Sequence, residues 1–401
     1  MPKIAFVINS LTNGGAERTV SNLSLNLPST YEIDIILNDV TNVGYSYRGN
    51  LISLNMKPRK NKLKLGYQII AFIIRWKKLR HLKSEKRYDA VISFSESANI
   101  ANILSGNRYC KTIVSVRVNL SSTSNNKMYK YIGFPLVRLF YNMADVVVAV
   151  SEGVRQDLIA NFRINSQKII TIPNGCDIKK IEAMCSEKLT EQEKEILAIE
   201  NVIITIGRLE YQKGQWYLIR ALSELKRKGL DFKLCILGVG GEERYYRELV
   251  KQLGLEDDIY FCGFYNNPFK LLYRAKLYVL PSLFEGMGNT LIEALACKIP
   301  CISTDHRSGA REILAPNTDV NYTNIDHIEY AEYGVIVPNF DGKKYSAIEP
   351  LTSEEKLLAV AIYEMIFDEE KRNDYKLKAK KRTQDFNLEN CIYEWMRLVE
   401  S

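Results

Sequence analysis

The alternation of strand-like and helix-like segments, which runs along the chain twice with one interruption, most restricts its fold. Apolar, β-branched runs occupy residues 4–8, 33–37, 51–54, 90–94, 112–116, 146–150 and 169–172. Helical stretches separate most of them. Near-continuous apolar strands that alternate with helices are typical of a parallel sheet covered on both faces.

The interruption falls at residues 176–200, which are rich in Glu and Lys and contain no strand-like run. The alternation then restarts, with runs at residues 202–206, 233–237, 259–262, 277–280, 301–303 and 335–337. A chain of 401 residues is also longer than one average core supports. We therefore predict two Rossmann-like α/β domains, 1–175 and 176–385, and a helix over 386–401 that crosses back to the first domain. Ligands of open α/β sheets bind beyond the carboxyl ends of the strands, so we expect the site in a cleft between the two sets of strand ends.

The cysteine and histidine content bears on whether the protein contains disulfides or a metal site. The eight cysteines are scattered without a C-x-x-C pair, and the three histidines have no cysteine at ligand spacing. We expect reduced, buried thiols and no metal site. A strand-like run follows the first residues directly, and no apolar run is long enough to span a bilayer, so we expect a cytoplasmic protein.

The net charge of +8 is concentrated in one segment. Residues 57–87 hold twelve Lys or Arg and a single acid, Glu85. Within this segment Arg75, Trp76, Lys77 and Lys78 follow an aliphatic run, and such a helix can lie on an anionic membrane surface. The alternative is an ordinary domain helix whose apolar face joins the core while its cations face water. Nucleic-acid binding is disfavoured, because no recognisable nucleic-acid module accompanies the charge.

The segment 281–294, Pro-Ser-Leu-Phe-Glu-Gly-Met-Gly-Asn-Thr-Leu-Ile-Glu-Ala, carries the clearest chemical signal. It follows a predicted strand and opens a helix, and Gly286 and Gly288 allow the backbone to approach a ligand closely. The start of the helix is an anion site, and Glu285 and Glu293 could accept hydrogen bonds from sugar hydroxyls on either side of it. Two alternatives stay open: Thr290 and Glu293 fit a helix capping box, and Glu285 could be an exposed loop acid.

A second motif, residues 206–214, follows the first strand of the second domain. Arg208 and Lys213 lie in a loop that leads to a helix, where two cations could bind a diphosphate; a solvated basic loop is the alternative. The glycine-rich turn at residues 238–241 is a weaker signal. At the N-terminus, residues 13–18 form another glycine turn, but they lack G-x-G-x-x-G spacing, which disfavours a nicotinamide-type dinucleotide site.

These residues identify a resemblance. The chain resembles the retaining glycosyltransferases of family 4, which have the GT-B fold and include bacterial enzymes of lipid-linked oligosaccharide and capsular polysaccharide assembly. Four landmarks occur in the family's order: residues 14–17 (Gly-Gly-Ala-Glu), 173–175 (Pro-Asn-Gly), Arg208 with Lys213, and the E-x7-E pair Glu285 and Glu293.

The resemblance implies roles for these residues. The first domain would bind the acceptor and the second the nucleotide-sugar donor. Arg208 and Lys213 would neutralise the departing diphosphate, Glu293 would bind the ribose and Glu285 the transferred sugar. The remaining donor contacts would be Gly14, Gly15, Gly207, Phe264, Gly286, Met287, Gly288, Asn289, Thr290 and Leu291.

Two departures from the family accompany these matches. Many relatives have a histidine after a central strand of the first domain, whereas this chain has Arg117 and Asn119 there, which could contact sugar or acceptor instead. An acidic, Asn-rich insertion occupies residues 315–332, where relatives turn more tightly.

The expected function is transfer of a hexose or N-acetylhexosamine from a UDP-sugar, with retention, to a saccharide acceptor carried on polyprenyl diphosphate. The chain contains no D-x-D motif, so we expect neither a metal nor another cofactor. The enzyme would lie on the inner face of the cell membrane. A nucleotide-sugar epimerase of the same fold and a non-catalytic membrane-surface protein remain the alternatives.

Overall fold

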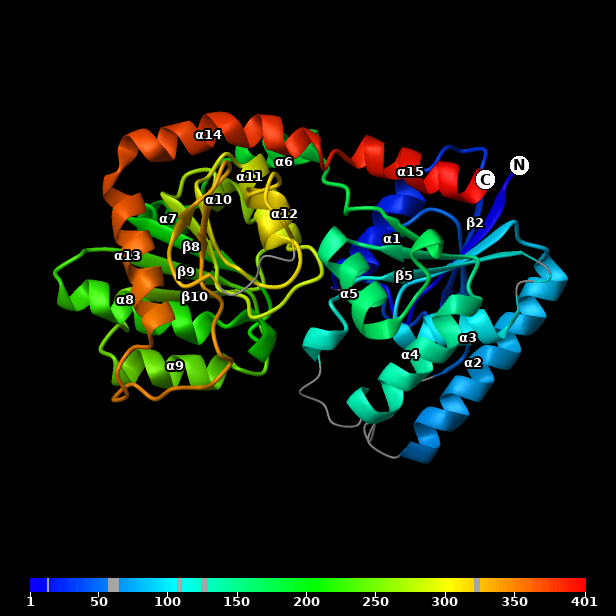
Figure 1. Ribbon diagram of the computed structural model, residues 1–401. Helices are drawn as coiled ribbons and strands as arrows, with labels where there is room; N and C mark the ends of the chain where they lie inside the picture. The colour runs from blue at the N-terminus through cyan, green and yellow to red at the C-terminus, as the bar shows by residue number, and fades with distance from the viewer. Residues whose placement is uncertain (13, 57–64, 107, 109, 124–128, 321–324) are drawn as a thin grey trace. The chain divides into compact units, whose positions relative to one another are not determined.

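The chain forms two compact α/β units in a computed structural model (Figure 1). The structure describes residues 1–401 except 13, 57–64, 107, 109, 124–128 and 321–324. The first unit comprises Met1–Gly175 together with Leu388–Ser401, and the second comprises Cys176–Asn387. The chain thus leaves the first unit after its last strand and returns to it for its final helix.

The first unit contains a seven-stranded parallel sheet in the order β3-β2-β1-β4-β5-β6-β7. Its strands are β1 (Lys3–Val7), β2 (Glu32–Leu37), β3 (Asn50–Ser53), β4 (Ala90–Ser93), β5 (Lys111–Val116), β6 (Val146–Ala149) and β7 (Ile169–Thr171). Its α-helices are α1 (Gly15–Asn26), α2 (Leu65–Lys86), α3 (Glu96–Leu104), α4 (Phe134–Phe140), α5 (Glu152–Phe162) and α15 (Leu388–Glu400).

The second unit repeats this plan, with strand order β10-β9-β8-β11-β12-β14-β13. Its strands are β8 (Val202–Ile206), β9 (Lys233–Leu237), β10 (Ile259–Gly263), β11 (Leu277–Leu280), β12 (Cys301–Thr304), β13 (Glu329–Tyr330) and β14 (Val335–Val337). Its α-helices are α6 (Ile178–Cys185), α7 (Glu191–Ile196), α8 (Gln215–Arg227), α9 (Glu243–Gln252), α10 (Phe269–Leu272), α11 (Asn289–Ala296), α12 (Ala310–Leu314), α13 (Ser353–Phe367) and α14 (Glu369–Gln384).

The second sheet is parallel except at one edge, where an additional short strand runs antiparallel. The insertion 315–332 ends in β13, which pairs antiparallel with β14. The buried Arg311 holds this edge in place: its guanidinium donates to Asp305 Oδ2 at 2.8 Å and lies 3.0 Å from Glu329 Oε2. A two-residue strand carries no periodic pattern, so the sequence could not reveal it.

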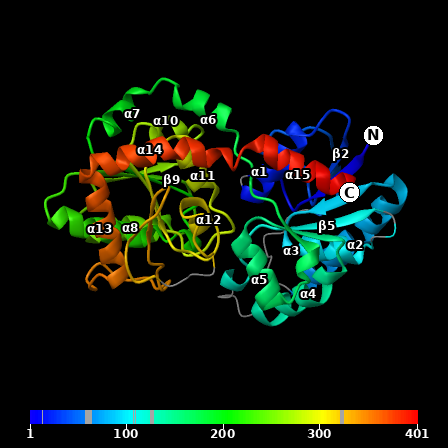
Figure 2. The ribbon, with the colours of Figure 1, turned by 45° about the horizontal axis from the view of Figure 1, so that its top comes forward.

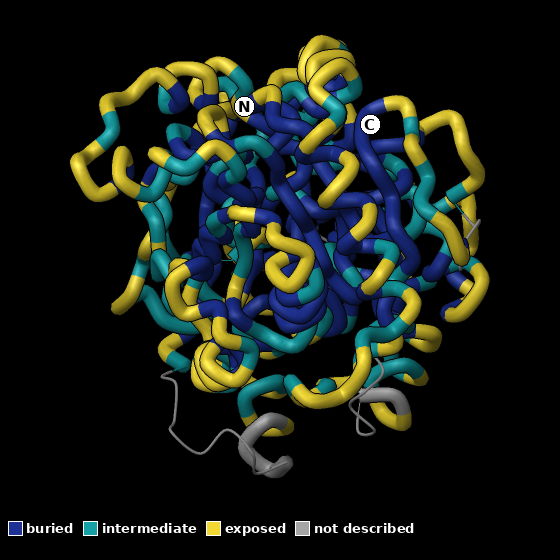
Figure 3. The backbone as a smooth tube through the Cα atoms, turned by 90° about the vertical axis from the view of Figure 1, so that its left-hand side faces the viewer, coloured by how far each residue is buried: buried dark blue, intermediate teal, exposed yellow. Residues whose placement is uncertain are grey.

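Apolar side chains fill the space between each sheet and its helices, and Figure 3 shows the buried stretches of the chain in dark blue in the interior. Strands such as β4 and β12 are buried along their whole length, as parallel strands covered on both faces require. In each sheet the order of connection reverses at one point, between β1 and β4 and between β8 and β11. Loops diverge at such a point, so it is the favoured place for a ligand in an open α/β sheet.

The final helix, α15, completes the first unit and lies beside α1 (Figure 2). Its Trp395 ring packs 5.8 Å from Phe94, between centroids, in the core of that unit. Tyr31 donates to Glu400 at 2.5 Å, and the ammonium of Lys111 donates to the carbonyl of Leu398 at 2.9 Å. The C-terminal residues are therefore a structural part of the N-terminal unit.

Candidate active site

The residues predicted to bind the donor gather at the point where the connections of the second sheet reverse. The loop after β8 contains Gln212, whose carbonyl accepts from the Leu283 N–H at 2.8 Å and whose side-chain amide donates to the Phe284 carbonyl at 2.8 Å. Gly214, at φ +60°, lies so close to Pro281 that a Cβ would be 2.3 Å from the Pro281 carbonyl oxygen. Two loops more than sixty residues apart in sequence are thereby joined into one surface.

Glu285 and Lys213 form a largely buried ion pair at the centre of this surface. Lys213 Nζ lies 2.5 Å from Glu285 Oε1, and the two side chains are only 14% and 11% exposed. Glu285 also accepts from Ser282 Oγ at 2.8 Å and from Gln212 Nε2 at 3.2 Å. The interpretation of Glu285 as an exposed loop acid is therefore wrong.

The environment of Glu285 keeps its carboxylate ionised. Burial by itself raises the pKa of this carboxyl, but the charge of Lys213, the nearby His306 and the hydrogen bonds from Lys213 and Ser282 outweigh it. The net pKa lies below its ordinary value. At neutral pH Glu285 can accept hydrogen bonds but cannot donate one.

Gly207 and Arg208 lie beside this pair and differ in exposure. A Cβ on Gly207 would lie 3.1 Å from Cδ and Cε of Lys213, so the lysine stem packs directly over the glycine. The Arg208 side chain is 60% exposed, and its ion pair with Glu210 at 3.1 Å is exposed as well. It can therefore turn toward a bound anion at little cost.

The start of α11 provides the anion-binding geometry. Gly288 precedes the helix at φ +84°, a conformation that glycine adopts without strain, and no side chain caps the helix. The capping box of Thr290 and Glu293 is not formed, because the helix begins one residue before Thr290; the Thr290 hydroxyl instead accepts from Tyr278 at 2.7 Å. Glu293 lies one turn further into the helix and is 7% exposed.

The other predicted donor contacts from this segment differ in accessibility. Gly286 and the side chains of Met287 and Leu291 are buried, so any ligand contact there would involve backbone atoms, whereas Asn289 is partly exposed. Phe264, directly after β10, is 65% exposed and is available to pack against a flat ligand group.

Two further glycine contacts bring the loop after β9 against the loop after β8. A Cβ on Gly238 would lie 1.9 Å from the Gly207 carbonyl oxygen, and one on Gly240 would lie 2.3 Å from that of Leu209. The glycines of this turn are therefore explained by packing within the unit: without side chains, they allow the two loops to pack backbone to backbone.

In the first unit the predicted residues lie at the carboxyl ends of β1 and β5. Gly14 precedes α1 and Gly15 is its first residue, with no side chain capping the helix. Arg117 donates to Thr19 Oγ1 at 2.9 Å and to Asn174 Oδ1. Burial lowers the pKa of Arg117 to about 10, with Cys391 opposing the shift, so the side chain is a cation at neutral pH.

Asn119 occupies a different environment. It is 3% exposed, and its Oδ1 accepts from the hydroxyls of Ser121 and Ser122 at 3.0 and 2.9 Å. These contacts hold the turn after β5 together, which leaves Arg117 as the more accessible of the two candidates.

The predicted membrane-docking group is largely wrong. Arg75 is 6% exposed and donates to Ser97, Asn9 and Asn38 at 2.7–2.9 Å. The Trp76 indole donates to the Leu104 carbonyl at 2.8 Å, and Lys78 donates to that of Leu54. Only Lys77 among the four is exposed. These side chains face inward because they anchor α2 to the rest of the unit; the basic residues at 57–64 lie outside the described residues.

Sequence reasoning missed three residues of the site: Ser282, Gln212 and His306. Serine and glutamine have no pattern of their own, and only the joining of two loops places both on one carboxylate. His306 is 2% exposed and lies two residues beyond β12. The one sequence feature that could have indicated His306 as a site residue is its position shortly after a predicted strand of the second domain.

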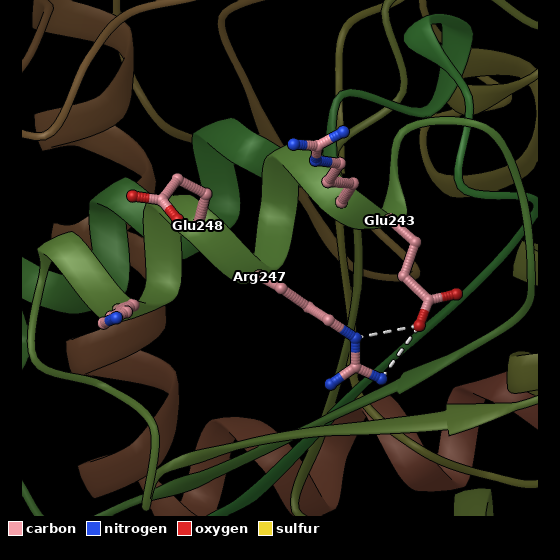
Figure 4. Close-up of a pocket in the computed structure, with 5 residues that line it drawn as sticks. Glu243, Arg247 and Glu248 are labelled. Atoms are coloured by element: carbon pink, nitrogen blue, oxygen red, sulfur yellow. Dashed lines mark hydrogen bonds and ion pairs between the residues drawn. The ribbon is translucent and has the colours of Figure 1, made fainter.

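Two observations concern other kinds of site. A shallow hollow on α9 is lined by Glu243, Arg244, Arg247, Glu248 and Lys251, with Glu243 and Arg247 paired at 2.8 Å (Figure 4). None of the predicted site residues lines it. Within the described part of the chain, no three or more His, Cys, Asp or Glu side chains gather as metal ligands would, and no helix has the length and apolar character needed to cross a membrane.

Comparison with known proteins identifies the family. Residues 13–180 match the model for Glycosyltransferase Family 4, and residues 187–331 match that for Glycosyl transferases group 1. An uncharacterized glycosyltransferase of Methanocaldococcus jannaschii is 33% identical over 352 residues, covering 85% of this chain and 86% of the relative. The chain belongs to glycosyltransferase family 4.

Relatives of this glycosyltransferase include one with a stated reaction. It is 29% identical, over 96% of both chains, to the N-acetylgalactosamine-N,N'-diacetylbacillosaminyl-diphospho-undecaprenol 4-alpha-N-acetylgalactosaminyltransferase of Campylobacter jejuni. HepE of Anabaena, solved in complex with UDP and glucose, has a TM-score of 0.74 at 19% identity and full coverage of both chains. The glycosyltransferase therefore has the GT-B fold, as predicted.

Proposed function

We propose that this glycosyltransferase moves a hexose or N-acetylhexosamine from a UDP-sugar to a saccharide acceptor linked to polyprenyl diphosphate, with retention of configuration and without a metal. The choice of a nucleotide-sugar donor rests on the ion pair of Lys213 with Glu285 and on the start of α11, which no side chain caps. Both lie where the loops after β8 and β11 diverge. A cation, a helix N-terminus and an ionised acceptor suit a diphosphate flanked by sugar hydroxyls.

Each of these groups has a part in the proposed reaction. Arg208 and Lys213 neutralise the charge that develops on the diphosphate as its bond to the sugar C1 breaks. Glu285 accepts hydrogen bonds from the transferred sugar, and Glu293 accepts them from the ribose. Phe264 lies against the base. Contact of Gly14 and Gly15 with the diphosphate stays a prediction from the family resemblance.

The substitution takes place on one face of the sugar. The acceptor hydroxyl oxygen bonds to C1 on the face from which the diphosphate leaves, and the hydroxyl proton passes to an oxygen of the departing UDP. Arg117, a cation at the end of β5 in the first unit, is available to contact the acceptor.

The relatives support the choice of acceptor and donor. The Campylobacter enzyme is named for an undecaprenol-linked saccharide and aligns with nearly the whole chain. A second relative in the same organism, 25% identical over 407 residues, also has a name that includes PP-undecaprenol. HepE was solved with UDP-glucose as well as UDP, which supports a UDP-sugar donor.

The test is a panel of UDP-sugars assayed for UDP release, with and without an undecaprenyl-diphosphate-linked saccharide. One donor is expected to release UDP only when the acceptor is present, with no change on adding EDTA, and the product is expected to keep the donor's anomeric configuration by NMR. Glu285→Ala is expected to abolish release. Inversion at C1, or turnover in Glu285→Ala equal to the wild type, would contradict the proposal.

We propose further that α2 rests on the anionic inner surface of the cell membrane through residues other than those first predicted. Ile69, Ile70, Ile73 and Ile74 are 38–57% exposed along one stretch of the helix, and exposed Lys77 and Arg80 follow them. Exposed aliphatic residues beside cations suit the boundary between headgroups and acyl chains of anionic lipids.

Vesicle sedimentation tests this surface. The wild type is expected to bind vesicles containing phosphatidylglycerol more strongly than neutral vesicles, and Ile70→Gln with Ile74→Gln is expected to weaken binding. Val360→Gln with Phe367→Gln on α13, an equally exposed apolar stretch of the second unit, is the control. Equal loss in both double variants would contradict a specific role of α2.

A further inference from the structure

His306 is a buried side chain that neither the predicted site nor the fold accounts for. It follows β12, which pairs with β11, the strand that leads into the donor loop. The hydroxyl of Thr304 donates to the Ser282 carbonyl at 2.5 Å, and the Ser308 N–H donates to the His306 carbonyl at 2.8 Å. The backbone on both sides of His306 is thus fixed against the segment that carries Glu285.

The imidazole of His306 has two polar atoms and no partner for either. Nδ1 and Nε2 are both buried without a hydrogen bond to any residue that the structure describes, and the side chain is 2% exposed. Leaving such groups unpaired is unfavourable, so they are rare in folded proteins and often have a function. Burial, assisted by Lys213 and opposed by Glu285, lowers the pKa of His306 to about 4, so the ring is neutral at pH 7 and retains one N–H donor.

Two anions compete for the ammonium of Lys213 in the proposed reaction: the Glu285 carboxylate and the donor diphosphate. Without a ligand, the ammonium is paired with Glu285. A bound diphosphate would attract the same ammonium, and the buried carboxylate would then have neutral donors in place of its cation: Ser282, Gln212 and the hydroxyls of the bound sugar. A further donor stabilises a buried carboxylate that loses its cation.

We propose that His306 is a positioning residue, which donates a hydrogen bond to Glu285 when the donor diphosphate draws Lys213 away. The inference rests on the proposed function. His306 lies near enough to both groups for each to influence its protonation. Backbone groups of Ser308 and of His306 itself also lie close to the ring, but neither forms a hydrogen bond of normal geometry with its nitrogens. Glu285 thereby stays charged and fixed while the sugar is transferred.

Replacing Lys213 by methionine imitates the withdrawal of its charge without any substrate. A double-mutant cycle of Lys213→Met and His306→Leu therefore tests the inference by thermal unfolding. With Lys213 present, His306→Leu is expected to leave Tm nearly unchanged, because the imidazole has no bond to lose. In the Lys213→Met background it is expected to lower Tm by about 5 °C, the scale of one hydrogen bond to a charged group in a unit of this size.

Further measurements separate this role from simple packing. His306→Asn retains an N–H donor and is expected to lower Tm less than His306→Leu in the Lys213→Met background. Below the pH at which Glu285 is protonated, the extra loss is expected to vanish. His327→Leu, which replaces an exposed histidine of the same unit, is the control.

Equal effects of His306→Leu in both backgrounds, or no effect in either, would overturn the inference. The cycle uses no sugar nucleotide. A failed transfer assay would therefore count against the proposed function alone, and an additive cycle would count against the role of His306 alone.

Discussion

At the scale of single residues, the Glu285 carboxylate depends on a cation for its stability. Lys213→Met would leave a buried negative charge with the neutral donors Ser282 and Gln212 and, in the role proposed above, His306. We expect the free energy of unfolding to fall by about 3 kcal/mol, the lower end for breaking a buried pair, because these donors remain. Urea denaturation at pH 7 measures it.

The double variant Lys213→Met, Glu285→Gln is the decisive comparison, since it removes the charge that Lys213→Met leaves unpaired. It is expected to regain part of the lost stability. Lys194→Met, which breaks an exposed pair with Glu191, is expected to have no measurable effect. A double variant less stable than Lys213→Met would show that the pair is not what stabilises this loop.

Residue types and spacing predicted Lys213 and Glu285 in one region, because a diphosphate and sugar hydroxyls require cations and carboxylates near a glycine turn, and the structure pairs these two side chains. The roles of Arg208 and Glu293 stay predictions. The direction of individual side chains could not be predicted. Arg75 has the composition of a surface cation, and only the neighbouring Asn9 and Asn38 show that it faces inward.

At the scale of elements, the loops after β8 and β9 pack backbone to backbone, and Gly240 is one of the residues that allow it. Gly240→Ala would place a Cβ 2.3 Å from the Leu209 carbonyl oxygen. We expect the free energy of unfolding to fall by about 1–3 kcal/mol, as overpacking does elsewhere, and donor binding to weaken because Arg208 precedes Leu209. Denaturation and UDP titration measure the two effects.

The adjacent Gly241 is a matched control. A Cβ there meets no atom within 4 Å, and its backbone does not require glycine. Gly241→Ala is therefore expected to leave stability unchanged or slightly higher. If both variants lose the same free energy of unfolding, the contact with the Leu209 carbonyl oxygen is not the reason why Gly240→Ala is destabilising.

Most elements could be predicted because parallel strands covered on both faces are continuous apolar runs. No comparable signal marks β13, whose two residues pair with β14 and whose Glu329 forms an ion pair with Arg311. The order of the strands was equally inaccessible, since periodicity reports faces and lengths but not neighbours. The position of the site at β8 and β11 therefore had to come from the structure.

At the scale of the whole molecule, each unit has a sheet whose connections reverse once, and the predicted donor residues lie almost entirely at that point of the second sheet. The first unit contains the glycine turn of α1, Arg117 and the final helix α15. In the proposed function, the second unit binds the nucleotide.

Calorimetric titration of UDP into the wild type, Arg208→Met and Arg247→Met tests this claim most directly. Both arginines are exposed, and each is paired with a different glutamate: Arg208 with Glu210 at 3.1 Å and Arg247 with Glu243 at 2.8 Å. Arg247 also lies over the Phe261 ring, 4.4 Å from its centroid, so Arg247→Met is the more disturbing of the two variants and a stringent control. We expect Arg208→Met to bind UDP at least about tenfold more weakly, the loss of one charge-assisted bond, and Arg247→Met to bind as the wild type does. Undiminished UDP affinity in Arg208→Met would contradict the account.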